Sequence, residues 1–459
     1  MVKEEQEGLR LRTSAAGTSS TPVTGRRRKL TQTVRLLPIV LSLAYLNLTV
    51  FLFVYGPWRY PVADGTTLYT FLAFAHLALL GGYLSAAFGK PRGYYGQWKV
   101  KHVIVISLTV NLLLLFPTAA LNTGNFFPDV LGGIANPGAV YSTSLAVRKE
   151  RTFLTAIGYV RILVGPFLYC MLLPLTVFYW RRLGWTARGL AIFALLGVVA
   201  TYVAMGTNKV VGETAFLIPW LLLAGHCAGV SRFSRSRKVL AVIGSVVVFL
   251  CFFAFFTNTM STRSLAMRSG YFRVTDKLIL VADYNHVLVR SLPPDVQVGV
   301  VGLTMYLTHG YYALYLSLQE PFVPMFGLGS SPFLARQAAR ITGVTEIMDF
   351  PYPKRIEKYG WDATMMWSSI YPWIASDVSF PGTIIVLFFI GRLFALSWLD
   401  TVRGRNPFAV VMFAQFLIML FYFPANNQVL LIGENITAFW GTMLLWLFTR
   451  RHYAWRARS

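Results

Sequence analysis

Ten apolar runs, each about long enough to cross a bilayer, alternate with short polar connections along this chain of 459 residues. A membrane-crossing helix needs roughly 20 predominantly apolar residues. Only 13% of the residues are charged, against about 25% in a soluble domain. We therefore predict an all-α polytopic membrane protein with about 10 (10–12) transmembrane helices. The runs lie at 36–55, 67–88, 103–121, 153–180, 188–206, 214–230, 238–257, 382–399, 407–424 and 428–449.

The distribution of basic residues predicts how these helices are oriented. The net charge is +24, from 42 Lys and Arg against 18 Asp and Glu. The tail 1–35, alternate connections and the tail 450–459 together hold 25 of the basic and 4 of the acidic residues, which is +21 of the +24. Basic residues gather on the cytoplasmic side of membrane proteins. We expect both termini in the cytoplasm, and we interpret the charge as topology rather than as nucleic-acid binding.

The chain divides into five regions on this basis. A disordered basic tail (1–35) lacks the apolar core and cleavage site of a signal peptide. Seven transmembrane helices (36–257) precede a large outer loop (258–381), and three more (382–449) precede a second basic tail (450–459). The cysteines Cys170, Cys227 and Cys251 show no CxxC spacing, which indicates neither a metal site nor a disulfide framework. We expect no metal and no cofactor.

The large outer loop is where we expect the chemistry to lie. It contains ten Lys or Arg, nine Asp or Glu and many aromatic residues. Sugar rings pack on aromatic faces while their hydroxyls bond charged groups, so this mixture favours carbohydrate, although an interfacial aromatic belt is the alternative. The run 298–318 predicts a short re-entrant or amphipathic helix that does not cross. Candidate sugar-binding residues are Tyr311, Tyr359 and Trp361.

Cationic side chains on the outer side are candidates for binding a pyrophosphate group. Arginine binds phosphate with a bidentate fork and lysine binds it as a point charge. In the loop, the alternative is a solvated surface on which the cations pair with Glu346, Asp349 and Glu357. The loop candidates are Arg336, Arg340, Lys354, Arg355 and Lys358.

Four ionisable residues lie within or beside the apolar runs. The spacing of Lys209 and Glu213 predicts a shared helical face, with either structural pairing or a substrate contact. Arg161 and Glu434 fall inside predicted helices, where an ionisable group is by default a functional candidate and snorkelling is the alternative.

Acid–base candidates in the outer loop are histidines and aspartates. An imidazole ordinarily titrates near neutrality, which makes His309 a candidate, but a lone histidine beside tyrosines is more often structural. Asp362 and Asp377 are the carboxylate candidates, with Asp283 and His286 in reserve. No metalloprotease, nucleophile-elbow, Walker or dinucleotide-binding motif appears in the sequence in a context that would support it.

Three stretches near the end of the outer loop resemble a known family. They are Tyr306-Leu-Thr-His-Gly-Tyr-Tyr-Ala-Leu, then Gly327-Leu-Gly-Ser-Ser-Pro-Phe333, then Trp361-Asp-Ala-Thr through Ile374-Ala-Ser-Asp377 with Pro381-Gly382. They are similar to motifs of the Wzy-type polymerases of oligosaccharide repeat units, which show a Tyr-Leu-Thr-Gly-Gly-like stretch and an Asp-Phe-Gly-x-x-Gly pattern. Here His309 replaces one glycine, and Asp377-Val-Ser-Phe-Pro-Gly stands for the second pattern.

The resemblance implies a polymerase in the bacterial inner membrane with its active site facing the periplasm. Its substrates would be undecaprenyl-pyrophosphate-linked oligosaccharides of O-antigen, capsule or exopolysaccharide, and a chain-length regulator would be a further partner. His309, Asp362 and Asp377 are then candidate bases. Candidate pyrophosphate ligands are Arg336, Lys354, Arg355, Lys209 and Arg161.

Two other readings of the chain stay open. An O-antigen ligase or another polyprenyl-dependent glycosyltransferase would place an acidic residue near Asp64, but no second carboxylate lies beside it. A flippase or transporter of lipid-linked glycan would show internal repeats with broken helices, and the sequence indicates no such repeat.

Overall fold

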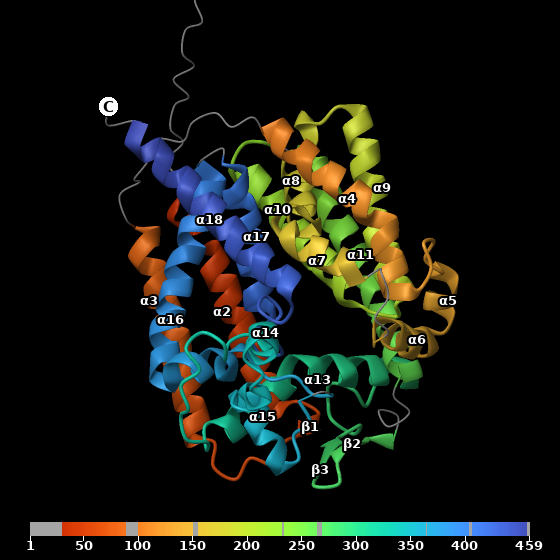
Figure 1. The fold of residues 1–459 in the computed structure, drawn as a ribbon, viewed down its shortest axis with the longest axis vertical. Coiled ribbons are helices and arrows are strands. Elements are labelled where there is room, and N and C mark those ends of the chain that lie inside the picture. Colours follow the sequence, from red (N-terminus) through yellow and green to blue (C-terminus); the bar gives the residue numbers. More distant parts are fainter. Residues whose placement is uncertain are drawn as a thin grey trace, which may run out of the picture. The chain divides into compact units, whose positions relative to one another are not determined.

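Helices dominate the computed structural model of the chain (Figure 1). Residues 35–459 form one compact unit, which is described below. The predicted N-terminal tail up to residue 29 and the basic connection 89–99 lie outside the described residues. The described ranges are 30–88, 100–149, 155–231, 234–263, 269–363, 365–403 and 406–456.

Seven helices of the described chain are long and apolar enough to cross a membrane, which confirms the prediction of a helical membrane protein. Each coincides with one of the predicted apolar runs. The seven are α2 (Gln32–Tyr55), α3 (Thr66–Ala87), α4 (Val100–Thr123), α9 (Trp185–Ala204), α10 (Lys209–Cys227), α11 (Arg235–Arg263) and α16 (Ile370–Arg403).

The other three predicted runs form helices of a different kind. The run 153–180 is broken into α7 (Thr155–Leu163), η1 (Gly165–Phe167) and α8 (Tyr169–Phe178), with a bend of 80°. Counted as one span, this pair would be the eighth. The last two runs are α17 (Pro407–Tyr422), only 16 residues long, and α18 (Gly433–Arg456), which continues into the predicted C-terminal tail.

Shorter elements fill the connections. The second long connection holds α5 (Val130–Ala135) and α6 (Pro137–Lys149), and η2 (Trp180–Arg182) follows α8. The residues between α11 and α16 are here called the connecting segment. They form the middle of the predicted outer loop 258–381, whose two ends belong instead to α11 and α16. The helical elements of the connecting segment are α13 (Pro294–Ser317), α14 (Pro332–Thr342), η3 (Thr345–Met348), α15 (Tyr352–Arg355) and η4 (Ile356–Tyr359).

A small antiparallel sheet, which the sequence analysis did not predict, joins the connecting segment to the connection between α2 and α3. It has the order β1-β3-β2, from β1 (Trp58–Arg59), β2 (Tyr271–Thr275) and β3 (Leu278–Ala282). Trp58 pairs with Ala282, and β3 alternates buried and exposed residues as a half-buried strand should. The all-α prediction is therefore correct for the apolar helices and incomplete for this segment.

The predicted non-crossing helix 298–318 corresponds to α13, which is not among the seven candidate spans. In Figure 1 it runs crosswise to α2 and α16. It is not a surface helix, because most of the residues in its second half are buried. Tyr311 is fully buried, and its hydroxyl shares a 2.9 Å hydrogen bond with that of Thr49 on α2. The helix is therefore part of the core.

Candidate functional site

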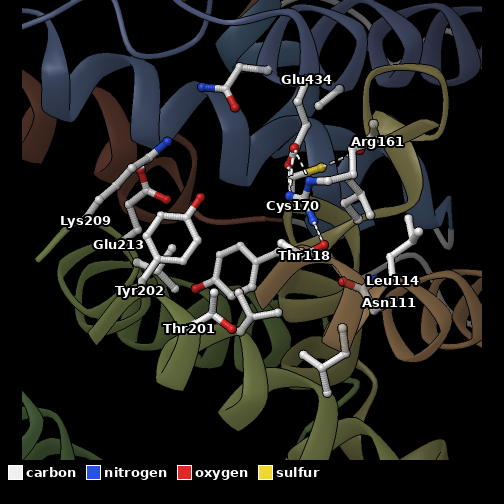
Figure 2. A pocket seen from close by; sticks show the side chains of 18 residues that line it. Asn111, Leu114, Thr118, Arg161, Cys170, Thr201, Tyr202, Lys209, Glu213 and Glu434 are labelled. Atoms are coloured by element: carbon white, nitrogen blue, oxygen red, sulfur yellow. Dashed lines mark hydrogen bonds and ion pairs between the residues drawn. The ribbon is translucent and has the colours of Figure 1, made fainter. Parts of the chain in front are cut away.

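A cavity of about 100 Å³ lies where α7 breaks from α8, among α4, α9, α10 and the start of α18. Figure 2 shows two pairs of opposite charges on its opposite walls, Arg161 with Glu434 and Lys209 with Glu213. Ionisable side chains inside apolar helices are costly and are by default functional candidates. The cavity is therefore the candidate functional site.

The break between α7 and α8 brings α18 to this cavity. Gly165 and Pro166 follow α7, and a Cβ at Gly165 would lie 2.3 Å from Oγ1 of Thr437, so only glycine allows this approach to α18. The Thr437 hydroxyl donates a 2.5 Å hydrogen bond to the carbonyl of Ile162, one of the groups that a helix end leaves free. Irregular backbone among apolar helices is tolerated where it is satisfied in this way or lines a cavity.

Arg161 and Glu434 form a closed pair. The arginine donates from Nε to Oε2 (2.8 Å) and from Nη2 to Oε1 (2.7 Å), and its Nη1 donates to the hydroxyl of Thr118 (2.6 Å). Arg161 lies in the last turn of α7 and Glu434 in the first turn of α18, positions where the helix dipoles favour these charges. Bidentate pairing of this kind fixes both side chains.

Lys209 and Glu213 form an open pair on the opposite wall. They are one turn apart at the start of α10, as their spacing predicted, with Nζ and Oε1 separated by 4.0 Å. This distance exceeds that of a hydrogen bond. Among the described residues the Lys209 ammonium donates no hydrogen bond, and the two side chains are 26% and 10% exposed. The ammonium can therefore donate to a ligand oxygen that enters the cavity beside the pair.

Neutral polar groups complete the lining. Tyr202 and Thr201 project from α9, and Tyr169 from α8 is hydrogen-bonded to Thr214. Asn111 on α4 donates to the carbonyl of Phe167 in the η1 turn (3.0 Å). Such groups can orient a bound polar molecule without adding charge.

Of the predicted pyrophosphate ligands, the cavity brings together only Lys209 and Arg161. Arg355 and Lys358 instead converge on Glu320, at 3.0 and 2.7 Å, and Lys354 pairs with Glu357 at 2.8 Å. The alternative prediction of surface pairing thus describes these cations, with Glu320 as the unforeseen partner. Arg336 and Arg340 are exposed on α14.

Glu320 is the centre of that cluster. Its side chain is 3% exposed, and it also accepts a 2.7 Å hydrogen bond from the Tyr359 hydroxyl. Burial alone would raise the pKa of Glu320, but hydrogen bonds from Lys358, Tyr359 and Arg355 outweigh it and place the pKa below the usual glutamate value. The predicted sugar-binding residue Tyr359 is therefore engaged within the protein.

His309 and Trp361 lie in the core of the connecting segment. His309 is 4% exposed, its Nδ1–H donates to the carbonyl of Met305 (2.7 Å), and its ring stacks on that of the fully buried Trp361. Burial lowers the pKa of His309 to about 4. This environment fits a structural role for His309 rather than a role as a base. Trp361 and Tyr311 are fully buried, so neither exposes a ring face on which a sugar could stack.

Asp377 holds a loop in place. Its carboxylate accepts hydrogen bonds from the backbone amides of Gly327 (2.8 Å), Gly329 (2.8 Å) and Ser330 (2.7 Å). Asp362 lies beside Trp361, and its carbonyl oxygen accepts a bond from the amide of Met366 (2.8 Å). Neither aspartate lines the cavity.

The same loop reaches the segment that precedes α18. The carbonyl of Ser330 accepts a 2.6 Å bond from Asn427, and the Ser331 hydroxyl donates to the carbonyl of Leu430 (2.8 Å). Glu434 lies four residues beyond Leu430. The connecting segment therefore touches the rim of the cavity through this loop without lining it.

The sequence analysis did not predict the neutral lining of the cavity or the pairing of Arg161 with Glu434. Gly165-Pro166 inside an apolar run was the available signal, because proline interrupts helices. Asp283 and His286 lie elsewhere, where Asp283 binds Arg59 (3.0 Å) and His286 donates to the carbonyl of Tyr55 (2.9 Å).

Comparisons of the chain with protein-family models, curated protein sequences and solved structures found no match. The function is therefore argued from the chemistry of the cavity and from the motifs of the sequence.

Proposed function

We propose that this chain is a membrane glycosyltransferase, a polymerase that joins undecaprenyl-pyrophosphate-linked oligosaccharide repeat units at the outer face of the bacterial inner membrane. The observation that carries the proposal is the open Lys209–Glu213 pair facing Arg161 in a cavity among apolar helices. A lipid-linked pyrophosphate is an anion that reaches such a place from within the bilayer. The resemblance of the 306–382 stretches to Wzy-type polymerases points to the same substrate class.

The cavity has the groups that such a transfer requires. Breaking the bond between the sugar and pyrophosphate places negative charge on the leaving group, and the Lys209 ammonium is positioned to stabilise that charge. The volume of about 100 Å³ suits a small polar head group. The polyprenyl tail and the remaining sugars would extend outside it.

The proposed orientation follows from the charge distribution and from one contact. The basic tails and connections place the termini in the cytoplasm under the positive-inside rule. The connecting segment then lies on the periplasmic side. Its contact between Ser330 and Asn427, close in sequence to Glu434, supports a cavity that opens toward the same side.

A polymerisation assay tests the proposal. Purified chain in nanodiscs is supplied with lipid-linked repeat units, and the products are separated by size. Products that grow by whole repeat units are expected; transfer to lipid A core would instead indicate a ligase, and no new bond would overturn the proposal.

One observation favours a second candidate, a transporter of lipid-linked glycan. Transporters bind substrates at broken helices that carry charged groups, and the 80° break between α7 and α8 beside Arg161 has this character. Movement of the lipid-linked unit across a vesicle membrane, without chain growth, would identify this function.

A further inference from the structure

A second, smaller cavity of about 80 Å³ adjoins the candidate site. The two share one wall, to which α8, α10 and α18 contribute. The residues that line both are Tyr169, Cys170, Lys209, Glu213, Asn435 and Ala438. The open ion pair therefore faces both cavities, whereas Arg161 and Glu434 line only the larger one.

Apart from the shared ion pair, the polar lining of the smaller cavity consists mainly of amides. Gln415 from α17 and Gln428 line it together with Asn435 from α18. Their conformations are fixed by hydrogen bonds, since Gln415 donates to the Ala438 carbonyl (3.2 Å) and Asn435 donates to the Gln428 carbonyl (2.5 Å). Within the described chain, the side-chain oxygens of Gln415 and Asn435 accept no hydrogen bond.

Fixed amides with free acceptor oxygens are suited to a neutral ligand rich in donors. A sugar hydroxyl or N–H offers such donors, and an anion does not. A phosphate would meet the amide oxygens as like partial charges. The two cavities thus differ outside their shared wall, where the larger one has the Arg161–Glu434 pair and the smaller one has Gln415 and Gln428.

Building on the proposed function, we propose that the smaller cavity binds the terminal sugar of the acceptor and that Glu213 is the base that activates its hydroxyl. The larger cavity holds the pyrophosphate of the donor. In the transfer, the acceptor oxygen forms a bond to the anomeric carbon of the donor, and the bond from that carbon to the pyrophosphate oxygen breaks. The hydroxyl proton passes to the Glu213 carboxylate, and the electron pair leaves with the pyrophosphate.

The position of Glu213 favours it over the other carboxylate of the site. Glu434 is held by both of its oxygens on Arg161. Glu213 is separated from Lys209 by 4.0 Å and accepts a hydrogen bond from the Tyr422 hydroxyl. Because a carboxylate has about four acceptor sites, Glu213 can still accept a hydrogen bond from a hydroxyl in the smaller cavity.

Two measurements on full-length protein in nanodiscs test the inference. The first is binding of undecaprenyl pyrophosphate without sugar, and the second is the rate of chain growth from lipid-linked repeat units. Glu213→Gln is expected to bind the probe within about threefold of wild type but to extend chains at least about 100-fold more slowly. Gln415→Leu is expected to raise the KM for the acceptor with little change in kcat.

Controls separate failure of the base from failure of the function. Glu346→Gln and Gln337→Leu carry the same chemical changes on the exposed η3 and on α14, and both should behave as wild type. Glu213→Asp, which keeps the carboxylate, should recover part of the rate if Glu213→Gln fails to fold. Chain growth by Glu213→Gln at the wild-type rate would overturn the base assignment alone. No chain growth by wild-type protein that still binds the probe would overturn the proposed polymerase.

Discussion

The cations of the cavity and those of the connecting segment differ in how completely carboxylates satisfy them. In the connecting segment, Arg355 and Lys358 both bond Glu320 at hydrogen-bonding distances. In the cavity, Lys209 stays 4.0 Å from Glu213. The cations of the connecting segment are therefore already hydrogen-bonded to a carboxylate. The Lys209 ammonium, inside an apolar helix bundle, can still donate hydrogen bonds to an anion.

This difference shows why charge alone is a poor guide to a binding site. The basic cluster 354–358 stands out in the sequence, yet its charges join η4 and α15 to the end of α13. Lys209 is a single basic residue at the start of α10. What marks it is its environment, which the sequence indicates only by the apolar runs on either side.

The largest expected effect comes from the closed pair of the cavity. Arg161→Ala leaves the Glu434 carboxylate partly buried without its bidentate partner, and we expect a loss of about 3–5 kcal/mol of stability. The double variant Arg161→Met, Glu434→Leu removes both charges and should be clearly more stable than the single one. Thermal unfolding in detergent measures both, and equal stability of the two variants would contradict a closed structural pair.

The pH dependence of stability tests the core of the connecting segment. The pKa of His309 is about 4 in the folded chain, against about 6.5 when unfolded. The unfolded chain therefore binds the extra proton first, and stability falls as the pH drops from about 6.5 to about 4. We expect wild type to lose on the order of 3 kcal/mol more than His309→Phe between pH 7 and pH 4. Thermal melts at both pH values measure this, and parallel losses would place His309 in water.

The sequence predicted local features of the site and missed the long-range ones. The four-residue spacing of Lys209 and Glu213 foretold their shared face on α10, because helix geometry is local. Arg161 and Glu434 were each identified as unusual. Their pairing was not, because 273 residues separate them and no periodic pattern relates two distant helices.

The same limit to local patterns explains which parts of the fold the sequence predicted. Hydropathy located every apolar helix, since burial in lipid acts on each run separately. It could not locate the sheet, in which Trp58 pairs with Ala282 and β1 has only two residues. Nor could it locate Glu320 as the centre of the basic cluster, because composition counts charges without pairing them.

A smaller loss of stability is expected in the connecting segment, where the cations that bind Glu320 are partly exposed to solvent. Glu320→Gln removes the charge that binds Arg355, whose side chain is 15% exposed, and we expect a loss of about 2 kcal/mol of stability near neutral pH. The depressed pKa of Glu320 means that this contribution is present above the usual glutamate value and disappears as the pH falls through the folded pKa. Glu357→Gln, at a more exposed pair, should cost less than about 1 kcal/mol. Neither variant should change binding of undecaprenyl pyrophosphate, and a loss of binding in Glu320→Gln would erase the contrast with the cavity.

The smallest effect concerns the loop that joins the two regions. Asp377→Asn keeps one acceptor oxygen for Gly327 and Gly329 but turns an amide donor toward the Ser330 amide, which costs about 1 kcal/mol. Hydrogen exchange at Ser330 should then quicken about fivefold, because local opening becomes easier by that amount. Asp349→Asn, which changes an exposed aspartate of the connecting segment, is the control. If Asp377 only orders the loop, chain growth should slow modestly with unchanged binding of undecaprenyl pyrophosphate. A loss of rate as large as that of Glu213→Gln would instead identify Asp377 as a candidate base. The reaction would then lie where α16 meets the 327–330 loop and not in the cavity.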